Sequence, residues 1–177
     1  GTISMAFDPA AGGNVPTLDG AAILARTPGL EAIAEIVPID RGRTAASHLT
    51  FKDVLGLWAD VRRVLDDPTF AGVVIVQGTD TIEETAYFLN LVVKSKKPVV
   101  LTAAMRPSTA LSADGPLNFF NAVAVASNKQ AAGRGVLVVV NDWIHGAASL
   151  TKASTTAVQT FLSPLSGLIG TVAYGEA

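Results

Sequence analysis

The chain has 177 residues, of which 49% are hydrophobic, and its formal net charge at pH 7 is −2. This length and apolar content suit one domain with a substantial core and exclude a disordered chain. The small net charge excludes the strongly basic surface typical of nucleic-acid and anionic-membrane binding, and no apolar stretch approaches the roughly 18 residues of a membrane span. The absence of cysteine excludes disulfides and thiolate chemistry. We therefore expect neither nucleic acid nor a membrane among the partners.

The first third of the chain is predicted to hold two helices and one strand. Residues 4–20 contain glycines and prolines without a hydrophobic period, which predicts an irregular, mobile loop. Asp19 is expected to cap a short helix that ends near Pro28. Residues 32–38 predict a strand terminated by proline, and apolar residues at helical spacing predict a longer helix over residues 50–65.

The centre of the chain is predicted to be a strand, a turn and a helix. Residues 73–76 are a continuous β-branched run, which favours a strand buried on both faces of a parallel sheet. Gly78 interrupts the run, and apolar residues then follow at helical spacing: Ile82, Ala86, Leu89 and Val93. The turn between them is expected at the carboxyl end of the strand, the edge where open α/β sheets bind ligands.

Thr79 and Asp80 lie in this predicted turn, and two interpretations of them stay open. Backbone N–H groups and the positive end of the helix dipole point to this edge, so both side chains could belong to a site for an anion or oxyanion. They could also only cap the helix, because Thr81 with Glu84 and Asp80 with Glu83 each fit a capping box. Spacing alone slightly favours capping.

The second half of the chain continues to alternate strands and helices. Apolar runs predict buried strands over residues 98–102 and 136–140, and a last strand is expected over 167–174. Between the first two, Asp114 is expected to cap a helix that carries Pro116 in its first turn. The order strand, helix, strand, helix, strand indicates an α/β sheet with right-handed crossovers.

Several motifs occur along the chain in the same order as in a known family. They are Gly1-Thr2-Ile3, Gln77–Ala86, Ala103–Ser108, Ser112–Pro116 and Leu150–Thr156. Together they resemble the bacterial-type L-asparaginases of the asparaginase/glutaminase family, whose first signature is a Gly-rich turn carrying a Thr. The match extends over most of the chain.

The resemblance implies a fold and a domain organisation. Residues 1–177 would form the amino-terminal α/β domain, with a mainly parallel, flavodoxin-like sheet flanked by helices and a β-hairpin after the fourth core strand. It also implies that the family's first strand and its second, smaller domain are missing from these residues. A loop near the start of the family's domain closes over the substrate and carries a Tyr, whereas residues 4–20 contain only Phe7 as an aromatic.

Thr79, Asp80 and Lys152 offer a set of groups for attack on an amide. A free hydroxyl is a poor nucleophile near neutral pH, so attack needs a base and donors for the oxyanion. A neutral Lys152 could take the Thr79 proton, while Asp80 could orient the lysine or bind a substrate ammonium. Alone, Lys152 would be interpreted as a solvated lysine, and its setting in the Leu150–Thr156 motif reverses that preference.

The resemblance also assigns roles to residues whose spacing in the sequence indicates no role. Thr2 would be the first catalytic threonine, which forms the acyl-enzyme, although so short a start leaves little to fix it in space. Ser47 aligns with a serine that holds the substrate α-carboxylate. His48, where many members have Gln, could donate to the same group or simply lie in a surface loop. Gly78 and Ala104 complete the substrate-binding set, Ala104 through a backbone carbonyl that faces the leaving amide.

Three further residues are interpreted as structural. Arg106 and Asp114 would hold a loop and cap a helix, and His145, which follows the expected hairpin, would be structural or on the surface. No cluster of histidines and carboxylates has the spacing of metal ligands, so neither a metal nor an organic cofactor is expected.

The function implied by the resemblance is hydrolysis of L-asparagine to L-aspartate and ammonia through a threonine-bound acyl intermediate. Two enzyme alternatives share the fold: a glutaminase-asparaginase, and an amidotransferase subunit that releases ammonia for use on transfer RNA. A non-catalytic small-molecule-binding α/β domain is the alternative from another class. The family further implies a homo-oligomer, a dimer or tetramer, in the cytoplasm or the periplasm, with the cytoplasm slightly favoured.

Overall fold

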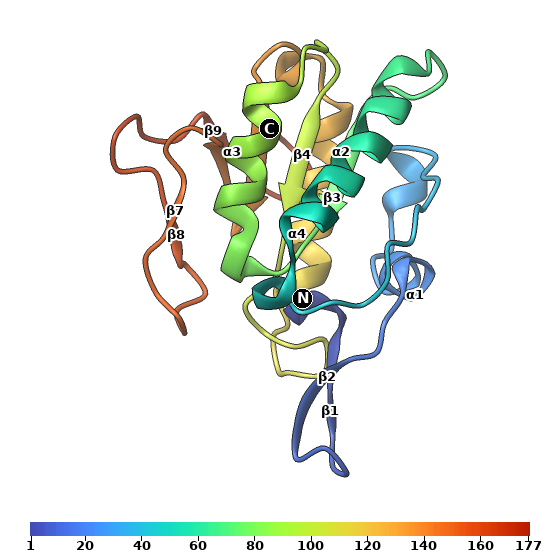
Figure 1. Cartoon of the computed structure of the whole chain (residues 1–177), viewed down its shortest axis with the longest axis vertical. Coiled ribbons are helices and arrows are strands. Elements are labelled where there is room, and N and C mark those ends of the chain that lie inside the picture. The colour runs from blue at the N-terminus through green and yellow to red at the C-terminus, as the bar shows by residue number, and fades with distance from the viewer.

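A five-stranded sheet lies at the centre of the computed structural model, which describes all 177 residues (Figure 1). The strand order is β3-β4-β5-β6-β9; β3, β4 and β5 run parallel, and β6 pairs antiparallel with both β5 and β9. The bounds are β3 Val73–Val76, β4 Val99–Thr102, β5 Val136–Val140, β6 Trp143–Gly146 and β9 Gly170–Thr171. Two small antiparallel pairs stand outside this sheet: β1 Met5–Asp8 with β2 Gly13–Pro16, and β7 Thr151–Lys152 with β8 Phe161–Leu162.

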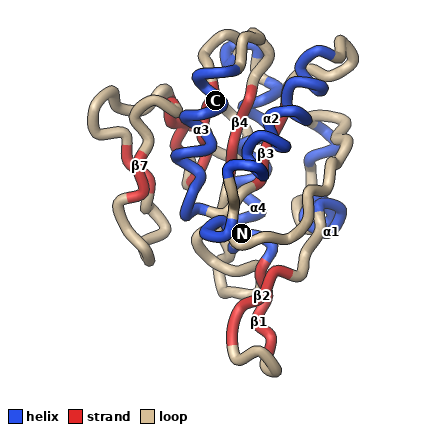
Figure 2. The backbone as a smooth tube through the Cα atoms, viewed as in Figure 1, coloured by secondary structure: helices blue, strands red, loops and turns tan.

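Helices connect the parallel strands, α3 between β3 and β4 and α4 between β4 and β5 (Figure 2). The α-helices are α1 Gly20–Ala25, α2 Phe51–Asp66, α3 Ile82–Val92 and α4 Gly115–Ser127. The 3-10 turns are η1 Thr2–Ser4, η2 Leu30–Ala32, η3 Ala46–His48, η4 Thr79–Thr81 and η5 Lys129–Ala131. The α/β class and the mainly parallel, helix-flanked sheet predicted from the sequence are confirmed.

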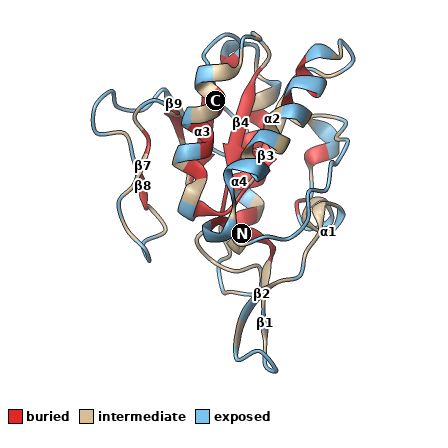
Figure 3. Ribbon diagram, in the orientation of Figure 1, coloured by how far each residue is buried: buried red, intermediate tan, exposed pale blue.

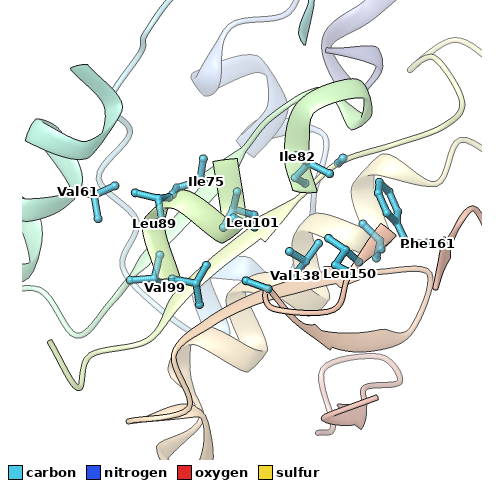
Figure 4. Close-up of a cluster of buried hydrophobic side chains, with 14 of the residues drawn as sticks. Val61, Ile75, Ile82, Leu89, Val99, Leu101, Val138, Leu150 and Phe161 are labelled. Carbon is cyan, nitrogen blue, oxygen red and sulfur yellow. The ribbon is translucent and has the colours of Figure 1, made fainter. Parts of the chain in front are cut away.

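The core lies on both faces of the sheet, because side chains alternate along each buried strand (Figure 3). Val99 and Leu101 of β4 pack in a cluster with residues of α2 and α3, whereas Val100 packs on the opposite side with residues of α4. All three are 0% exposed. Figure 4 shows the first cluster, in which side chains from α2, α3 and the three parallel strands meet. Continuous apolar runs suit β4 and β5, whose residues are all buried, whereas β3, predicted to be buried on both faces, is only partly buried apart from Ile75.

The helix cap predicted at Asp19 and the predicted hairpin are present. Thr50 and Asp53 form a reciprocal capping box at the start of α2, and the Asp19 carboxylate accepts from the Ala22 N–H group at 2.8 Å at the start of α1. Asn141 and Asp142 link β5 to β6 with φ values of 50° and 66°. Positive φ at both residues matches the twist of a two-residue hairpin, and Asn and Asp tolerate it better than most residues.

Residues 4–20 are not the irregular loop that the sequence predicts. Residues 5–16 form the β1–β2 hairpin, with Met5 paired to Pro16 and Asp8 to Gly13. The hairpin closes because the Asp8 carboxylate accepts from the Ala10 N–H group at 2.8 Å and Gly12 adopts a φ of +64°. A short ribbon of this kind has no buried face, so it leaves no hydrophobic period in the sequence.

The strand predicted over residues 32–38 is wrong. Only Ala32 lies in a regular element, at the end of η2, and residues 34–45 have no helix or strand. The physical reason is the absence of a pairing partner, since a strand exists only through hydrogen bonds to a neighbour. The last strand is also shorter than predicted, with β9 limited to residues 170–171.

β3 is an edge strand whose second side is open. Its Val73 and Gln77 N–H groups donate towards β4, to Pro98 and Thr102. In a parallel ladder the N–H groups between them, those of Val74 and Val76, therefore face away from β4. A cavity of about 770 Å³ lies along that edge and is lined by β3, residues 33–42 and part of α2. The apolar residues of the segment predicted as a strand thus face β3 across a cavity.

We expect Leu89→Ala to lower the free energy of unfolding by about 2–5 kcal/mol, because it opens a cavity in the cluster between α3 and the sheet. Leu89 is 0% exposed, whereas Leu91 of the same helix is 56% exposed. Leu91→Ala is the matched control and should change the value by less than about 0.5 kcal/mol. Denaturant unfolding measures both, and equal losses would show that α3 does not pack as described.

His145 is completely buried in β6, which makes it a structural residue rather than a surface one. Its Nδ1 atom lies 2.8 Å from the Ser163 hydroxyl, and its Nε2 atom has no hydrogen-bond partner. Burial penalises the charged imidazolium and lowers the pKa of His145 from 6.5 to about 4.

This lowered pKa predicts acid sensitivity. The unfolded chain takes up the proton near pH 6.5 and the folded chain only near pH 4, so stability should fall as the pH decreases through that window. The loss should approach about 3 kcal/mol. His145→Asn removes the titrating group, so its free energy of unfolding should change less with pH than that of the wild type. Parallel curves for the two proteins in urea titrations between these pH values would contradict the assignment.

Candidate active site

The carboxyl end of β3 leads directly into the turn η4, and Gln77 holds that turn in shape. The Gln77 side-chain amide donates to the Thr81 carbonyl at 3.1 Å, the Thr81 hydroxyl at 3.1 Å and the Thr85 hydroxyl at 2.9 Å. Gln77 and Thr85 are buried, so these bonds are shielded from competing water. The turn that carries Thr79 and Asp80 is therefore fixed from its inner side.

The Lys152 amine reaches this turn from β7. Lys152 Nζ donates to Thr79 Oγ1 at 2.8 Å and to Asp80 Oδ1 at 2.7 Å. Thr79 is 6% exposed, while the side chains of Lys152 and Asp80 are 16% and 57% exposed. The amine thus joins a buried hydroxyl to a solvated carboxylate. A hollow of about 450 Å³ lined by Asp80, Lys152 and residues 153–155 opens beside them.

The capping boxes predicted for α3 are wrong. Thr81 is the residue that precedes α3, and its side chain makes no capping bond. Its hydroxyl instead donates to the Ala46 carbonyl at 3.1 Å, and Glu83 accepts from the Lys152 N–H group at 2.6 Å. Both side chains are used to hold other segments of the chain, so the start of α3 has no side-chain cap. Asp80, the other predicted cap, contacts Lys152.

Ser47 and His48 lie in η3, which packs directly against Gly78. A Cβ atom on Gly78 would come within 2.6 Å of the Ala46 Cβ atom, a distance that real contacts do not show. Only glycine therefore allows η3 to approach the end of β3 so closely. Ser47 and His48 are both exposed beside this contact.

The turn containing Thr2 also lies at this edge of the sheet. The Ser4 N–H and hydroxyl groups both donate to the Gly1 carbonyl, at 2.9 and 2.8 Å, which closes η1 around Thr2. Gly1 contacts Gly78, whose Cβ position would lie 3.1 Å from the Gly1 Cα atom. Ile3, on the other side of Thr2, packs in a cluster with Ala104. The turn around Thr2 therefore sits against the ends of both β3 and β4.

Asp114 and Asn118 hold the loop around Ala104. The Asp114 carboxylate accepts from the Met105 and Arg106 N–H groups, each at 2.9 Å, and makes no capping bond to α4. The prediction that Asp114 holds a loop is borne out by this contact, and the prediction that it caps the helix is wrong.

Asn118 is a residue that the sequence analysis missed. Its amide donates to the Ala103 carbonyl at 2.9 Å and accepts from the Asn141 N–H group at 2.8 Å, which joins the ends of β4 and β5. The one available signal was a polar side chain at a position four residues after Asp114, on the same helical face. Gln77 lies in the Gln77–Ala86 motif, but the sequence likewise assigned it no role.

No group of three or more His, Asp or Glu side chains is arranged to hold a metal ion. None of the helices combines the length and the apolar content needed to cross a membrane.

Comparison with known proteins gives the family. The sequence profile described as "Asparaginase, N-terminal" matches residues 1–177. A glutaminase-asparaginase of Acinetobacter glutaminasificans is 44% identical over 155 residues, which cover 88% of this chain and 46% of that protein. A probable periplasmic L-asparaginase of Haemophilus influenzae is 64% identical over 99 residues, covering 56% of this chain and 28% of that protein.

A solved structure agrees with these relatives. The crystal structure of a probable cytoplasmic L-asparaginase from Campylobacter jejuni matches with a TM-score of 0.87 and 42% identity, over 89% of this chain and 50% of that chain. The chain therefore belongs to the asparaginase family, to the part described as its amino-terminal domain. It spans about half the length, or less, of the relatives it matches. The resemblance drawn from the sequence motifs is confirmed.

Proposed function

We propose that this protein hydrolyses the side-chain amide of L-asparagine, giving L-aspartate and ammonia. The observation that carries the proposal is the contact of one lysine amine with both a buried threonine hydroxyl and a carboxylate, Lys152 with Thr79 and Asp80. A hydroxyl nucleophile needs such a base within hydrogen-bond distance. Family membership and the L-asparaginase names of several relatives support the choice of reaction and substrate.

The reaction passes through a threonine ester. A threonine oxygen attacks the amide carbon and gives its proton to a base, which passes it to the amide nitrogen as the C–N bond breaks and ammonia leaves. Water then cleaves the ester, which releases aspartate and restores the threonine hydroxyl. The family resemblance gives the ester to Thr2, and the geometry gives a base to Thr79. In the contact described above the Lys152 amine donates to Thr79. Proton transfer to the lysine requires the reverse bond, with the Thr79 hydroxyl donating to a neutral amine.

The residues around this set would bind the rest of the substrate. Ser47 and His48 are exposed and follow Ala46, which contacts Gly78, so the Ser47 hydroxyl would donate to the α-carboxylate. The Ala104 carbonyl would accept from the leaving amide, and Asp80 would hold the α-ammonium. No metal or organic cofactor takes part in this proposal.

A second candidate activity is hydrolysis of L-glutamine at the same site. It is favoured by the relative from Acinetobacter glutaminasificans, named a glutaminase-asparaginase, which is 44% identical over 155 residues. Ammonia release measured with each amide in turn tests both candidates. Release from neither amide by the full-length protein would overturn the proposed function and favour a binding domain.

We expect Thr79→Val in the full-length protein to lower ammonia release from asparagine at least about 100-fold, the usual scale of losing positioned proton transfer. Valine keeps the branched shape and deletes only the hydroxyl. Thr171→Val in β9, where the side chain is exposed, is the control and should keep the wild-type rate. Thr79→Val that retains activity with a cooperative melt would show that Thr79 does not act in the chemistry.

We also propose that the site is completed in a homo-oligomer, by a carboxylate from a second domain of a neighbouring subunit. Residues 1–177 alone should then hydrolyse asparagine at least about 100-fold more slowly than the full-length protein, since small misplacements of reacting groups cost about that much. Both are assayed at equal concentration after a check for monodispersity. A rate within about tenfold of the full-length protein, abolished by Thr79→Val, would show that these residues are self-sufficient.

A further inference from the structure

The backbone of Lys152, and not only its amine, is held by the start of α3. The Glu83 carboxylate accepts from the Lys152 N–H group at 2.6 Å, across a sequence separation of 69 residues. Glu83 is half-buried and does not cap its own helix. A carboxylate that accepts from an N–H group forms a charge-assisted bond, about twice as strong as a neutral one. The positive end of the α3 dipole favours a negative charge at this position.

Packing already anchors part of the segment that carries Lys152, because Leu150 before β7 and Phe161 of β8 are 7% and 2% exposed and belong to the core cluster between α3 and the sheet. β7 contains only Thr151 and Lys152 and pairs only with β8, and the two form a ribbon that stands apart from the main sheet (Figure 1). An isolated pair of such short strands is marginally stable at best. Packing therefore holds the neighbours of Lys152, whereas hydrogen bonds to η4 and α3 connect Lys152 itself to the turn that carries Thr79.

Three side-chain hydrogen bonds make that connection, and they differ in kind. The bonds from Lys152 Nζ to Thr79 and Asp80 involve the amine, so a proton transfer changes them. The bond from Glu83 involves the backbone N–H group, which does not titrate. A lysine side chain has four flexible carbons between these two points, so fixing its backbone limits where its amine can go. Glu83 can thus keep Lys152 in place throughout a reaction cycle.

We propose that Glu83 is a positioning residue, which holds the Lys152 backbone so that its amine meets Thr79 and Asp80. This inference rests on the proposed function for its effect on the reaction, but not for the contact itself. Asp80 of η4 and Glu83 of α3, three residues apart, hold the amine and the backbone N–H group of one lysine. Glu84, the next residue along, is exposed and provides a control of the same charge.

The first test follows the Lys152 N–H group and needs no substrate. Hydrogen exchange is measured by NMR on the full-length protein as wild type, Glu83→Ala, Glu83→Gln and Glu84→Ala. Loss of the acceptor in Glu83→Ala should raise exchange at Lys152 at least about tenfold, the scale of one net hydrogen bond. Glu83→Gln keeps a carbonyl oxygen at the same reach and should retain most of the protection, as should Glu84→Ala. Unchanged exchange in Glu83→Ala would overturn the proposal.

The second test separates positioning from general stability. Glu83→Ala should lower kcat for asparagine by about 10- to 100-fold with KM changed less than about threefold, because a misplaced base slows the chemical step rather than binding. Glu83→Gln should recover kcat to within about threefold, since the interaction needs an acceptor and not a charge. An equal loss in Glu84→Ala, or a Glu83→Gln variant as slow as Glu83→Ala, would overturn it.

A negative result for the proposed function and a negative result for Glu83 can be told apart. If the full-length wild type releases no ammonia from asparagine, the proposed function is wrong, while the exchange measurement still decides whether Glu83 holds Lys152. If Glu83→Ala does not fold, Glu83→Asp and its control Glu84→Asp decide. The shorter side chain of Glu83→Asp should lose the bond and raise exchange at Lys152 at least about tenfold, and equal exchange in the two variants would overturn the proposal.

Discussion

The Lys152 amine is shared between the Thr79 hydroxyl and the Asp80 carboxylate, and the rest of the site is arranged around that contact. The lysine side chain is only 16% exposed, so few waters compete for its amine, and its bonds are stronger than on an open surface. Asp80 remains 57% exposed, which keeps the cost of desolvating its charge low. The pair therefore holds the amine without burying an ion completely.

This contact is possible because side chains that could cap α3 contact other segments instead. Thr81 contacts the turn that carries Ser47, and Glu83 contacts the strand that carries Lys152. The buried amide of Gln77 holds the turn in their place. The start of α3 then lacks a side-chain cap, and it continues directly from the turn η4. Local helix stability is given up for contacts between distant segments.

The segment beside the open edge of β3 also shows that regular structure depends on a hydrogen-bonding partner. Residues 33–38 belong to the segment predicted as a strand and line the cavity beside β3, but no neighbour pairs with them, and they have no helix or strand. The β1–β2 hairpin is the converse case, since pairing gives it a regular structure that its composition does not predict. In both segments the hydrogen-bonding partner, rather than the local sequence, decides the outcome.

The sequence by itself determined the three parallel strands, the helices between them and the set of motifs that identifies the family. These features depend on patterns within about 20 residues, such as the β-branched run of β3 and the helical spacing of α3, which local chemistry dictates. Only the tertiary structure decided that Lys152 meets Thr79, that Glu83 holds Lys152, and that Asn118 joins β4 to β5. The Lys152 contacts join residues 69 to 73 positions apart, and no local pattern distinguishes a carboxylate that caps its helix from one that binds a distant strand. That choice follows from which segments the packed sheet brings within reach.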